Sequence, residues 1–559
     1  MSANVSTPET GKPGMHPFLR ALLGLLLLFP ACGLCSINLL GLSLQNFMGS
    51  LRSFSYTKAG GFIGIENYSR LFNNPRLSSM FGYTFSIIIV HVLLAALPLL
   101  MVLLVNTFGK KLKLGVRLFF TLPLAFFGPV LVMYGPGYIR SLWATDSPEN
   151  SYLLIDALAG LALACGVGMI VYFAVLRSQE VEGNWKIPWK PLIITWLIAQ
   201  FATVAYVIQS FNMLSGLLST RGSNIPGNFL FQTIRQIQGG VTFAFSTIIL
   251  FVISLLGVAA ALLLILGRVQ LKVEPREETA DIPPVRGVLN ITGWVALVIG
   301  GIAVLLVSVL PWFLALFRSV TALQDGFGSI SILQVWMNSL LPSLLLILFI
   351  QLPVAYLGAL GIGVTRPFGN ASKWLLLLFS PWLFVTPLSF GFASLLNMRE
   401  FKLLNTLFAL TPSVLVSVPM IFVFTLFFIG QGPKWQEARA AGGSAISAFF
   451  KQLVIPSLPI VVLMVAFSLL VGVQDLFTPS TTGVNPKLYT ATTAMLVSAA
   501  THINSGTPAL ILILFGLPVS FFFFIVFAAL QVFYLDRLKI TYEANPKEQA
   551  PKEVEPANP

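Results

Sequence analysis

The sequence predicts an all-α membrane protein of about twelve transmembrane helices, arranged as two tandem halves of about six helices each. Of the 559 residues, 56% are hydrophobic and 9% are charged, and the mean hydropathy is +0.87. This is more apolar surface than a soluble core could bury. The apolar runs are about 20 residues or longer, enough for a helix to cross roughly 30 Å of hydrocarbon, and they lack the alternation of barrel strands. A charged segment divides the chain near its middle.

The expected helices follow the apolar runs in chain order. Their bounds are about 18–43, 81–106, 116–136, 152–176, 191–213, 243–267, 289–317, 338–363, 374–396, 407–430, 458–476 and 508–534. An even number of spans puts both termini on one side of the membrane. Most of the 33 Lys and Arg residues, Lys110, Arg117 and Arg537 among them, then fall on that same side. Because basic residues are retained in cytoplasmic loops, both termini are expected in the cytoplasm.

The two halves are flanked by polar tails. Residues 1–16 and 541–559 are rich in Pro, Glu, Lys, Asn and Thr and are expected to be disordered. The first half covers 17–267 and the second covers 289–540. Between them, residues 268–288 read RVQLKVEPREETADIPPVRGV, which is linker composition. This linker is either an ordinary cytoplasmic loop or the joint between two ancestral subunits that fused.

A polar to amphipathic segment, residues 431–457, separates the tenth and eleventh spans. It contains EARAAGGSAISAFFKQLVIP. Glu437 is expected near a helix start, where the helix dipole favours an acid by about 0.3–1 kcal/mol. Gly443 and its neighbour Gly442 would let the chain bend, and Pro456 suits the first turn of the next span. An apolar face is predicted from residues near helical spacing, namely Trp435, Ala438, Ile446, Phe449 and Leu453.

The spacing in this segment fits E-A-A-x3-G-x9-I-x-L-P, with Glu437, Ala438, Gly443 and Pro456 in place and Arg439 as a departure. That pattern resembles the cytoplasmic EAA loop of ABC importer permeases, the membrane subunits that a separate ATPase grips. The resemblance implies a type I importer fold, a loop that contacts the ATPase, and a solute-binding protein outside the cell. The coupling residues it implies are Glu437, Ala438, Arg439, Gly443, Phe449, Leu453 and Pro456. The alternative is an interfacial amphipathic helix lying on the membrane.

The first half also resembles an importer subunit. GIENYSRLF, followed later by FFTLP, is similar to the start of the first permease of maltose-type sugar importers, with matches at Gly64, Asn67, Tyr68, Leu71, Phe72, Leu122 and Pro123. The second half, with NSLLPSLLL and LLNTLFAL ahead of the EAA-like loop, resembles the second permease of such a pair. Together these segments imply a fused sugar-importer permease of a bacterial inner membrane that works with two ATPase copies.

The corresponding loop of the first half is much shorter. Residues 177–190 read RSQEVEGNWKIPWK, which cannot hold an EAA-type helix pair. Trp185 and Trp189 are the candidates for a reduced contact with the ATPase. We therefore predict asymmetric coupling, in which the second half carries most of the contact.

Polar residues in the fifth span of each half, all but one of them uncharged, are the candidate substrate pathway. Polar groups are expensive at membrane depth and are often functional there. In the family that the chain resembles, these spans line the cavity, and amides and hydroxyls suit a neutral polyol. The candidates are Gln200, Thr203, Tyr206, Gln209, Asn212, Ser468, Gln474 and Asp475. The alternative for each is a hydrogen bond that holds helices together.

Other functional classes fit less well. The sequence contains no phosphate-cradling GxxxxGK[ST] loop, so any ATP is expected to be bound by the partner and no cofactor is expected on this chain. No catalytic residue or metal site is predicted, since Cys32, Cys35 and Cys165 lie in apolar runs and His91 reads as a helix-packing residue. A secondary transporter would want more ionisable groups at mid-membrane. Fused importers of iron, thiamine or polyamines remain the alternative to a carbohydrate.

Overall fold

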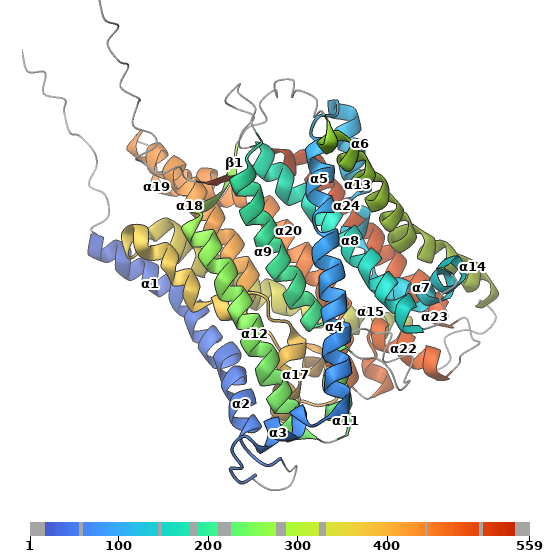
Figure 1. Cartoon of the computed structure of the whole chain (residues 1–559). Helices are drawn as coiled ribbons and strands as arrows, with labels where there is room; N and C mark the ends of the chain where they lie inside the picture. The colour runs from blue at the N-terminus through green and yellow to red at the C-terminus, as the bar shows by residue number, and fades with distance from the viewer. Residues whose placement is uncertain are drawn as a thin grey trace, which may run out of the picture.

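A computed structural model describes residues 17–54, 60–143, 148–177, 187–210, 225–236, 238–274, 287–322, 331–441, 444–483, 485–501 and 507–542. Nearly all of these residues are helical (Figure 1). Within the described ranges, nine helices are long and apolar enough to cross a membrane. The prediction of an all-α membrane protein is therefore confirmed at this level. The predicted tails, most of the linker and most of the loop at 177–190, including Trp185, lie outside the described residues.

Within the described residues, the first half contains fourteen named segments between Pro17 and Val273. They are α1 (Pro17–Leu34), η1 (Cys35–Leu40), α2 (Gly41–Ser50), α3 (Glu66–Phe72), α4 (Pro75–Leu94), α5 (Leu97–Val105), α6 (Lys110–Phe119), η2 (Leu122–Ala125), α7 (Gly128–Trp143), α8 (Pro148–Leu176), α9 (Trp189–Ile208), α11 (Pro226–Arg235), α12 (Gly239–Leu266) and β1 (Val269–Val273). Here η marks a 3₁₀ or π segment.

The second half likewise runs from an apolar first helix to a terminal strand. Its segments are α13 (Val288–Val304), η4 (Leu305–Val309), α14 (Leu310–Ala322), α15 (Ile332–Leu346), η5 (Ile347–Gln351), α16 (Leu352–Leu360), η6 (Gly361–Thr365), η7 (Gly369–Leu378), η8 (Ser380–Trp382), α17 (Pro387–Glu400), η9 (Leu407–Leu410), α18 (Val418–Ala440), α19 (Ala445–Phe449), η10 (Phe450–Val454), α20 (Ile455–Val473), α21 (Phe477–Thr482), η11 (Pro486–Leu488), α22 (Ala491–Thr501), α23 (Thr507–Ile511), η12 (Leu512–Gly516), α24 (Leu517–Phe533), η13 (Leu535–Arg537) and β2 (Leu538–Tyr542).

Three expected spans differ from single apolar helices. The span expected at 116–136 is broken, because α6 with η2 meets the start of α7 at 79°. The span expected at 374–396 is η7, η8 and α17. Proline lacks an amide hydrogen and clashes with the preceding turn of a helix. One break lies between Pro123 and Pro129, and the other lies between Pro381 and Pro387. The tenth expected helix begins only at Val418, with Pro419 in its first turn, and runs on to Ala440.

The first helix of each half packs against the other half. α1 contacts α16 and η6, and α13 contacts α5 and α8. Small residues permit the close approach. A Cβ on Gly361 would lie 2.7 Å from the carbonyl oxygen of Gly24, and one on Gly293 would lie 2.7 Å from Cβ of Leu104. The two halves are therefore interlocked through their first helices.

The two terminal strands of the halves pair with each other. β1 follows α12, β2 follows α24, and they form an antiparallel ribbon in which Leu271 lies opposite Ile540. These residues were expected in a linker and at a tail boundary, and strands were not predicted there. The alternation of apolar and polar residues in VQLKV and LKITY is the signal typical of such strands.

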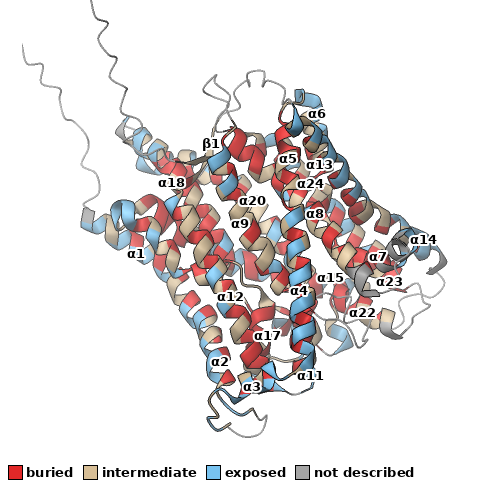
Figure 2. Ribbon diagram, in the orientation of Figure 1, coloured by how far each residue is buried: buried red, intermediate tan, exposed pale blue. Residues whose placement is uncertain are grey.

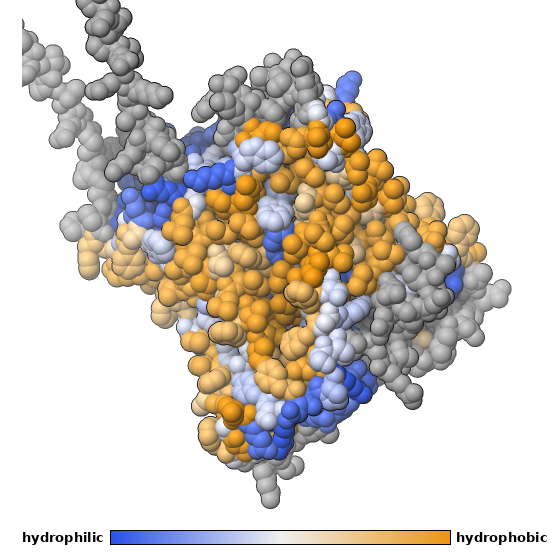
Figure 3. Space-filling model, viewed as in Figure 1, coloured by the Kyte–Doolittle hydropathy of each residue, from blue (hydrophilic) through white to orange (hydrophobic). Residues whose placement is uncertain are grey.

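Apolar side chains cover the outside of the bundle as well as its interior. Buried residues concentrate between the helices (Figure 2), with fully buried aromatics such as Phe245, Phe392 and Phe428. On the outside, Phe251 and Phe349 are 64% and 72% exposed. The visible face is a broad apolar belt with hydrophilic patches toward its two ends (Figure 3). This is the surface expected of a bundle solvated by lipid.

The G-x-x-N-Y residues of the first half form a small structural tie. Gly64 has a φ of +62°, which favours glycine. The side chain of Asn67 is buried and donates to the carbonyls of Ser50 and Arg52 at 2.9 and 2.8 Å, and the hydroxyls of Tyr68 and Ser50 lie 2.7 Å apart. The motif thus fastens α3 to the end of α2.

Candidate functional site

The segment that resembles an EAA loop begins in the last turns of α18. Glu437 is exposed there, while Ala438 and Arg439 are half-buried. The Arg439 guanidinium lies 5.2 Å from the ring centroid of Trp435, a cation–π contact. The expectation that Glu437 lies near a helix start is wrong, because α18 continues past the apolar run to Ala440. At a helix C-terminus the dipole opposes an acid, so the helix itself does not stabilise this carboxylate.

The rest of the segment turns back toward the membrane as α19, η10 and α20. Ala448 and Leu453 are buried and Phe449 is half-buried, but Ile446 is 71% exposed. The expected apolar face is therefore formed without Ile446. The carbonyl of Pro456 accepts a 2.7 Å hydrogen bond from the hydroxyl of Tyr534. Gly442 and Gly443 lie outside the described residues. We call residues 431–457 the lever segment.

β1 lies directly on the lever segment. The side chains of Gln431 and Lys434 both donate to the carbonyl of Val273, each at 3.1 Å. A Cβ on Gly430 would lie 2.3 Å from the carbonyl oxygen of Leu271, so glycine is what allows the strand to touch α18. The ribbon and α18 therefore meet through main-chain contact.

The other strand of the ribbon is fastened to the first half. Arg117 on α6 and Arg177 at the end of α8 both pair with Asp536, and Arg177 also donates to the carbonyl of Leu535. The Arg117 guanidinium donates to the side chain of Gln531 at 2.6 Å. Sequence reasoning missed this cluster, although both arginines fall at ends of expected spans.

An ion pair also joins the two strands. Lys539 donates to Glu274 at 2.5 Å. Partial burial raises the pKa of Glu274. The hydrogen bond from Lys539 and the charges of Lys539, Lys434 and Lys272 together lower it by more than burial raises it, so the pKa lies below its ordinary value. At neutral pH the carboxylate is ionised and the pair is formed.

The candidate pathway residues fall into different environments. Gln200 is buried, and among the described residues neither atom of its side-chain amide has a hydrogen-bond partner. Tyr206 is 58% exposed, and Thr203 donates to the carbonyl of Ala199 in its own helix. Ser468 is half-buried, and Asp475 accepts from the amide of Thr478 at the start of α21. Asn212 lies outside the described residues.

Gln209 and Gln474 are both engaged with main-chain atoms of the opposite half. Gln209 donates to the carbonyl of Phe384, and Gln474 donates to that of Phe126. For these two residues the geometry favours the alternative of a bond that holds helices together.

His91 and Asp156 lie close together within the first half. Nε2 of His91 is 3.8 Å from Oδ2 of Asp156, and Nδ1 lies 2.9 Å from the carbonyl of Ile87. A carbonyl only accepts, so Nδ1 carries a hydrogen and Nε2 faces the carboxyl oxygen. No cluster of three or more potential metal ligands occurs within the described ranges.

No family model, curated protein or solved structure matches this chain.

Proposed function

We propose that this chain is the membrane-spanning permease subunit of an ABC importer, driven by a separate cytoplasmic ATPase. The observation that carries the proposal is the lever segment. α18 extends beyond the apolar bundle, ends in an exposed turn that bears Glu437, and is followed by the exposed short helix α19 before the chain re-enters as α20. An ATPase that binds this projection could move two transmembrane helices at once.

In this proposal the lever segment faces the cytoplasm of a bacterial cell, and twelve spans place both termini there. Basic residues gather at the same end, including Lys110, Lys272, Lys434 and Arg537, as the retention of positive charge on the cytoplasmic side requires. Arg20, near the start of α1, donates to the carbonyl of Val364 at this end. The partners are two ATPase copies and an extracytoplasmic solute-binding protein.

The proposed substrate is a small neutral solute, with a carbohydrate preferred. The polar side chains of the fifth span of the first half, Gln200, Thr203 and Tyr206, are uncharged. Such groups suit hydroxyls, whereas an anion would call for arginine or a helix terminus. Iron complexes, thiamine and polyamines remain the alternative cargoes.

The test is affinity purification of the full-length chain from its native membrane, followed by measurement of ATP hydrolysis in the purified complex. A co-purifying ATPase is expected. Glu437→Lys should remove it, because the exposed carboxylate would become a cation. Glu66→Lys, an exposed acid on α3 away from the lever segment, is the control and should retain the ATPase. Purification without any nucleotidase would contradict the proposal.

An ion-coupled transporter is the second candidate, and the His91–Asp156 pair favours it. Ionisable groups within a membrane helix are costly and commonly belong to proton pathways. Uptake into native vesicles that follows an imposed proton gradient in the absence of ATP, and that is lost in Asp156→Asn, would support this candidate. Uptake that needs ATP and ignores the gradient would eliminate it.

A further inference from the structure

The broken third span of each half receives a glutamine from the other half. In the second half, the break lies between η8 and α17. Nε2 of Gln209, at the end of α9, donates to the carbonyl of Phe384 at 2.7 Å, and Oε1 accepts from the amide of Thr386 at 2.7 Å. The hydroxyls of Thr386 and Ser389 add bonds to Oε1 at 3.0 and 2.8 Å.

The first half shows the same arrangement with the roles exchanged. Its break lies between η2 and α7. Nε2 of Gln474, at the end of α20, donates to the carbonyl of Phe126 at 3.2 Å, and Oε1 accepts from the amide of Gly128 at 2.8 Å. A Cβ on Gly128 would lie 3.1 Å from that oxygen, so glycine leaves room for the bond.

The two contacts are related by the tandem repeat of the chain. Gln209 and Gln474 each follow the fifth long helix of their half. In each break the carbonyl and the amide belong to residues i and i+2, and each break is followed by a helix that has proline in its first turn, Pro129 or Pro387. Reciprocity of this kind is expected where two similar halves are related by a pseudo-two-fold axis.

The glutamines have little capacity left for a solute. A side-chain amide has two donor hydrogens and one oxygen with two lone pairs. Both Nε2 atoms make a second contact, Gln209 with the carbonyl of Ala205 and Gln474 with that of Leu470. Gln209 is also buried. A solute would therefore have to displace these bonds to reach either amide.

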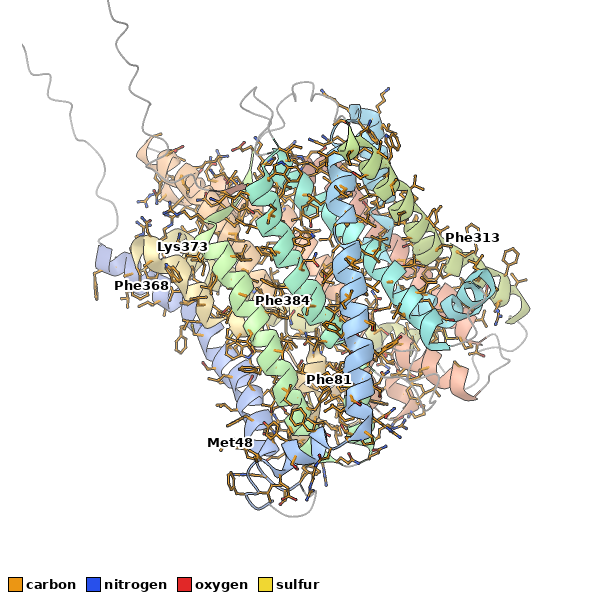
Figure 4. The ribbon with its side chains drawn as sticks, in the orientation of Figure 1. Met48, Phe81, Phe313, Phe368, Lys373 and Phe384 are labelled. Carbon is orange, nitrogen blue, oxygen red and sulfur yellow. The ribbon has the colours of Figure 1, made fainter. Side chains whose placement is uncertain are left out.

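The break of the second half lies at membrane depth, where bonds to the main chain matter most. Phe384 lies near the middle of the bundle, between Lys373 and Met48 (Figure 4). In hydrocarbon, non-helical backbone persists only where protein or water satisfies its polar groups. Separation of the halves at these points would leave main-chain groups of both breaks unpaired until water or a polar solute entered. The free-energy cost of leaving these groups unpaired is the amount by which the bonds stabilise the closed state.

We propose that Gln209 and Gln474 form a reciprocal latch that closes the solute pathway between the two halves and is released when the pathway opens. The inference rests on the proposed function only in that the halves enclose a pathway. Each glutamine is a positioning residue that holds the broken span of the other half, and the latch needs no ATPase to stay closed.

The test is passive permeability of proteoliposomes that contain the purified full-length chain. Gln209→Met and Gln474→Met keep the side-chain length and remove the hydrogen bonds. We expect sorbitol to leave vesicles that contain the double variant roughly tenfold faster than those with the unmodified chain, as the loss of several hydrogen bonds predicts. Gln351→Met is the matched control. Gln351 is buried and donates to a main-chain carbonyl, that of Val414, but within its own half.

Three results would overturn the latch. One is a double variant that is folded by thermal unfolding yet leaks no faster than the unmodified chain. Another is an equal leak through Gln351→Met. If the double variant does not fold, each single variant should leak faster than Gln351→Met, and failure of both is the third. Because the assay contains no ATPase, a chain that purifies without an ATPase would contradict the proposed function and leave the latch standing.

Discussion

Single residues at the contact between the ribbon and α18 decide how closely the two elements approach. Gly430 and Gly432 lie in the same helix, two residues apart, but in different surroundings. A Cβ on Gly430 would lie 2.3 Å from the carbonyl oxygen of Leu271, whereas the nearest atom to one on Gly432 is 3.9 Å away. The same substitution should therefore have opposite effects at the two positions.

Gly430→Ala should destabilise the protein by about 1–3 kcal/mol, because the added methyl group pushes the backbone of β1 away from α18. Gly432→Ala should be neutral or stabilising by up to about 1 kcal/mol, since alanine is the better helix former. Thermal unfolding of both variants in detergent measures the difference. Equal stability of the two variants would contradict the contact.

The carboxylate of Asp536 pairs with both Arg117 and Arg177. Asp536→Asn should cost about 3–5 kcal/mol, because it removes the negative charge with which both buried guanidinium groups pair. Glu66→Gln, which removes an exposed pair with Arg70, should cost less than about 1 kcal/mol. Unfolding midpoints of the two variants compare a buried pair with an exposed one, and similar losses would contradict this account.

At the scale of elements, the strand ribbon connects the lever segment to the first half. β1 touches α18 through Gln431 and Lys434, and the η13–β2 segment is held by Arg117 and Arg177. A displacement of α18 would therefore reach the first half through two paired strands. The first half is therefore connected to α18 through the ribbon, even though its own loop at residues 177–190 is short.

The ribbon should loosen in acid. The pKa of Glu274 is below its ordinary value of 4.5 in the folded protein, so ionisation favours the fold at neutral pH. That contribution is complete above the unfolded pKa and is lost as the pH falls from about 4.5 through the lowered value. Glu274→Gln should have a lower unfolding temperature than the unmodified chain at pH 7, and the difference should vanish in strong acid. A constant difference across this range would contradict the ion pair.

At the scale of the whole molecule, the halves share an order of elements but differ at the end that bears the lever segment. Under the proposed function, replacing Glu437 and Gly443 should nearly abolish transport-linked ATP hydrolysis. Deletion of residues 180–186 should reduce it far less, because the ribbon still connects the first half to α18. Steady-state ATPase rates of the assembled complex measure this, and equal losses would contradict asymmetric coupling.

Some features could be predicted because they depend on composition and local pattern. The membrane class follows from the apolar runs, since burial in lipid requires only length and hydrophobicity. Twelve spans were expected, and nine helices within the described residues meet this requirement. The helix breaks at Pro123 and Pro381 were passed over because hydropathy alone does not register a missing amide. The position of Glu437 was misjudged because α18 continues past the apolar run that marked its expected end.

The sequence by itself determined the class of this protein, and it predicted the tandem organisation and the resemblance of the lever segment, because each is read from local patterns in the chain. Only the tertiary structure decided the partners of the polar side chains. Gln209 and Phe384 are 175 positions apart, and Gln474 and Phe126 are 348 apart, so no local pattern joins them. Main-chain groups exposed by a break at membrane depth must be satisfied, and the two halves satisfy each other's.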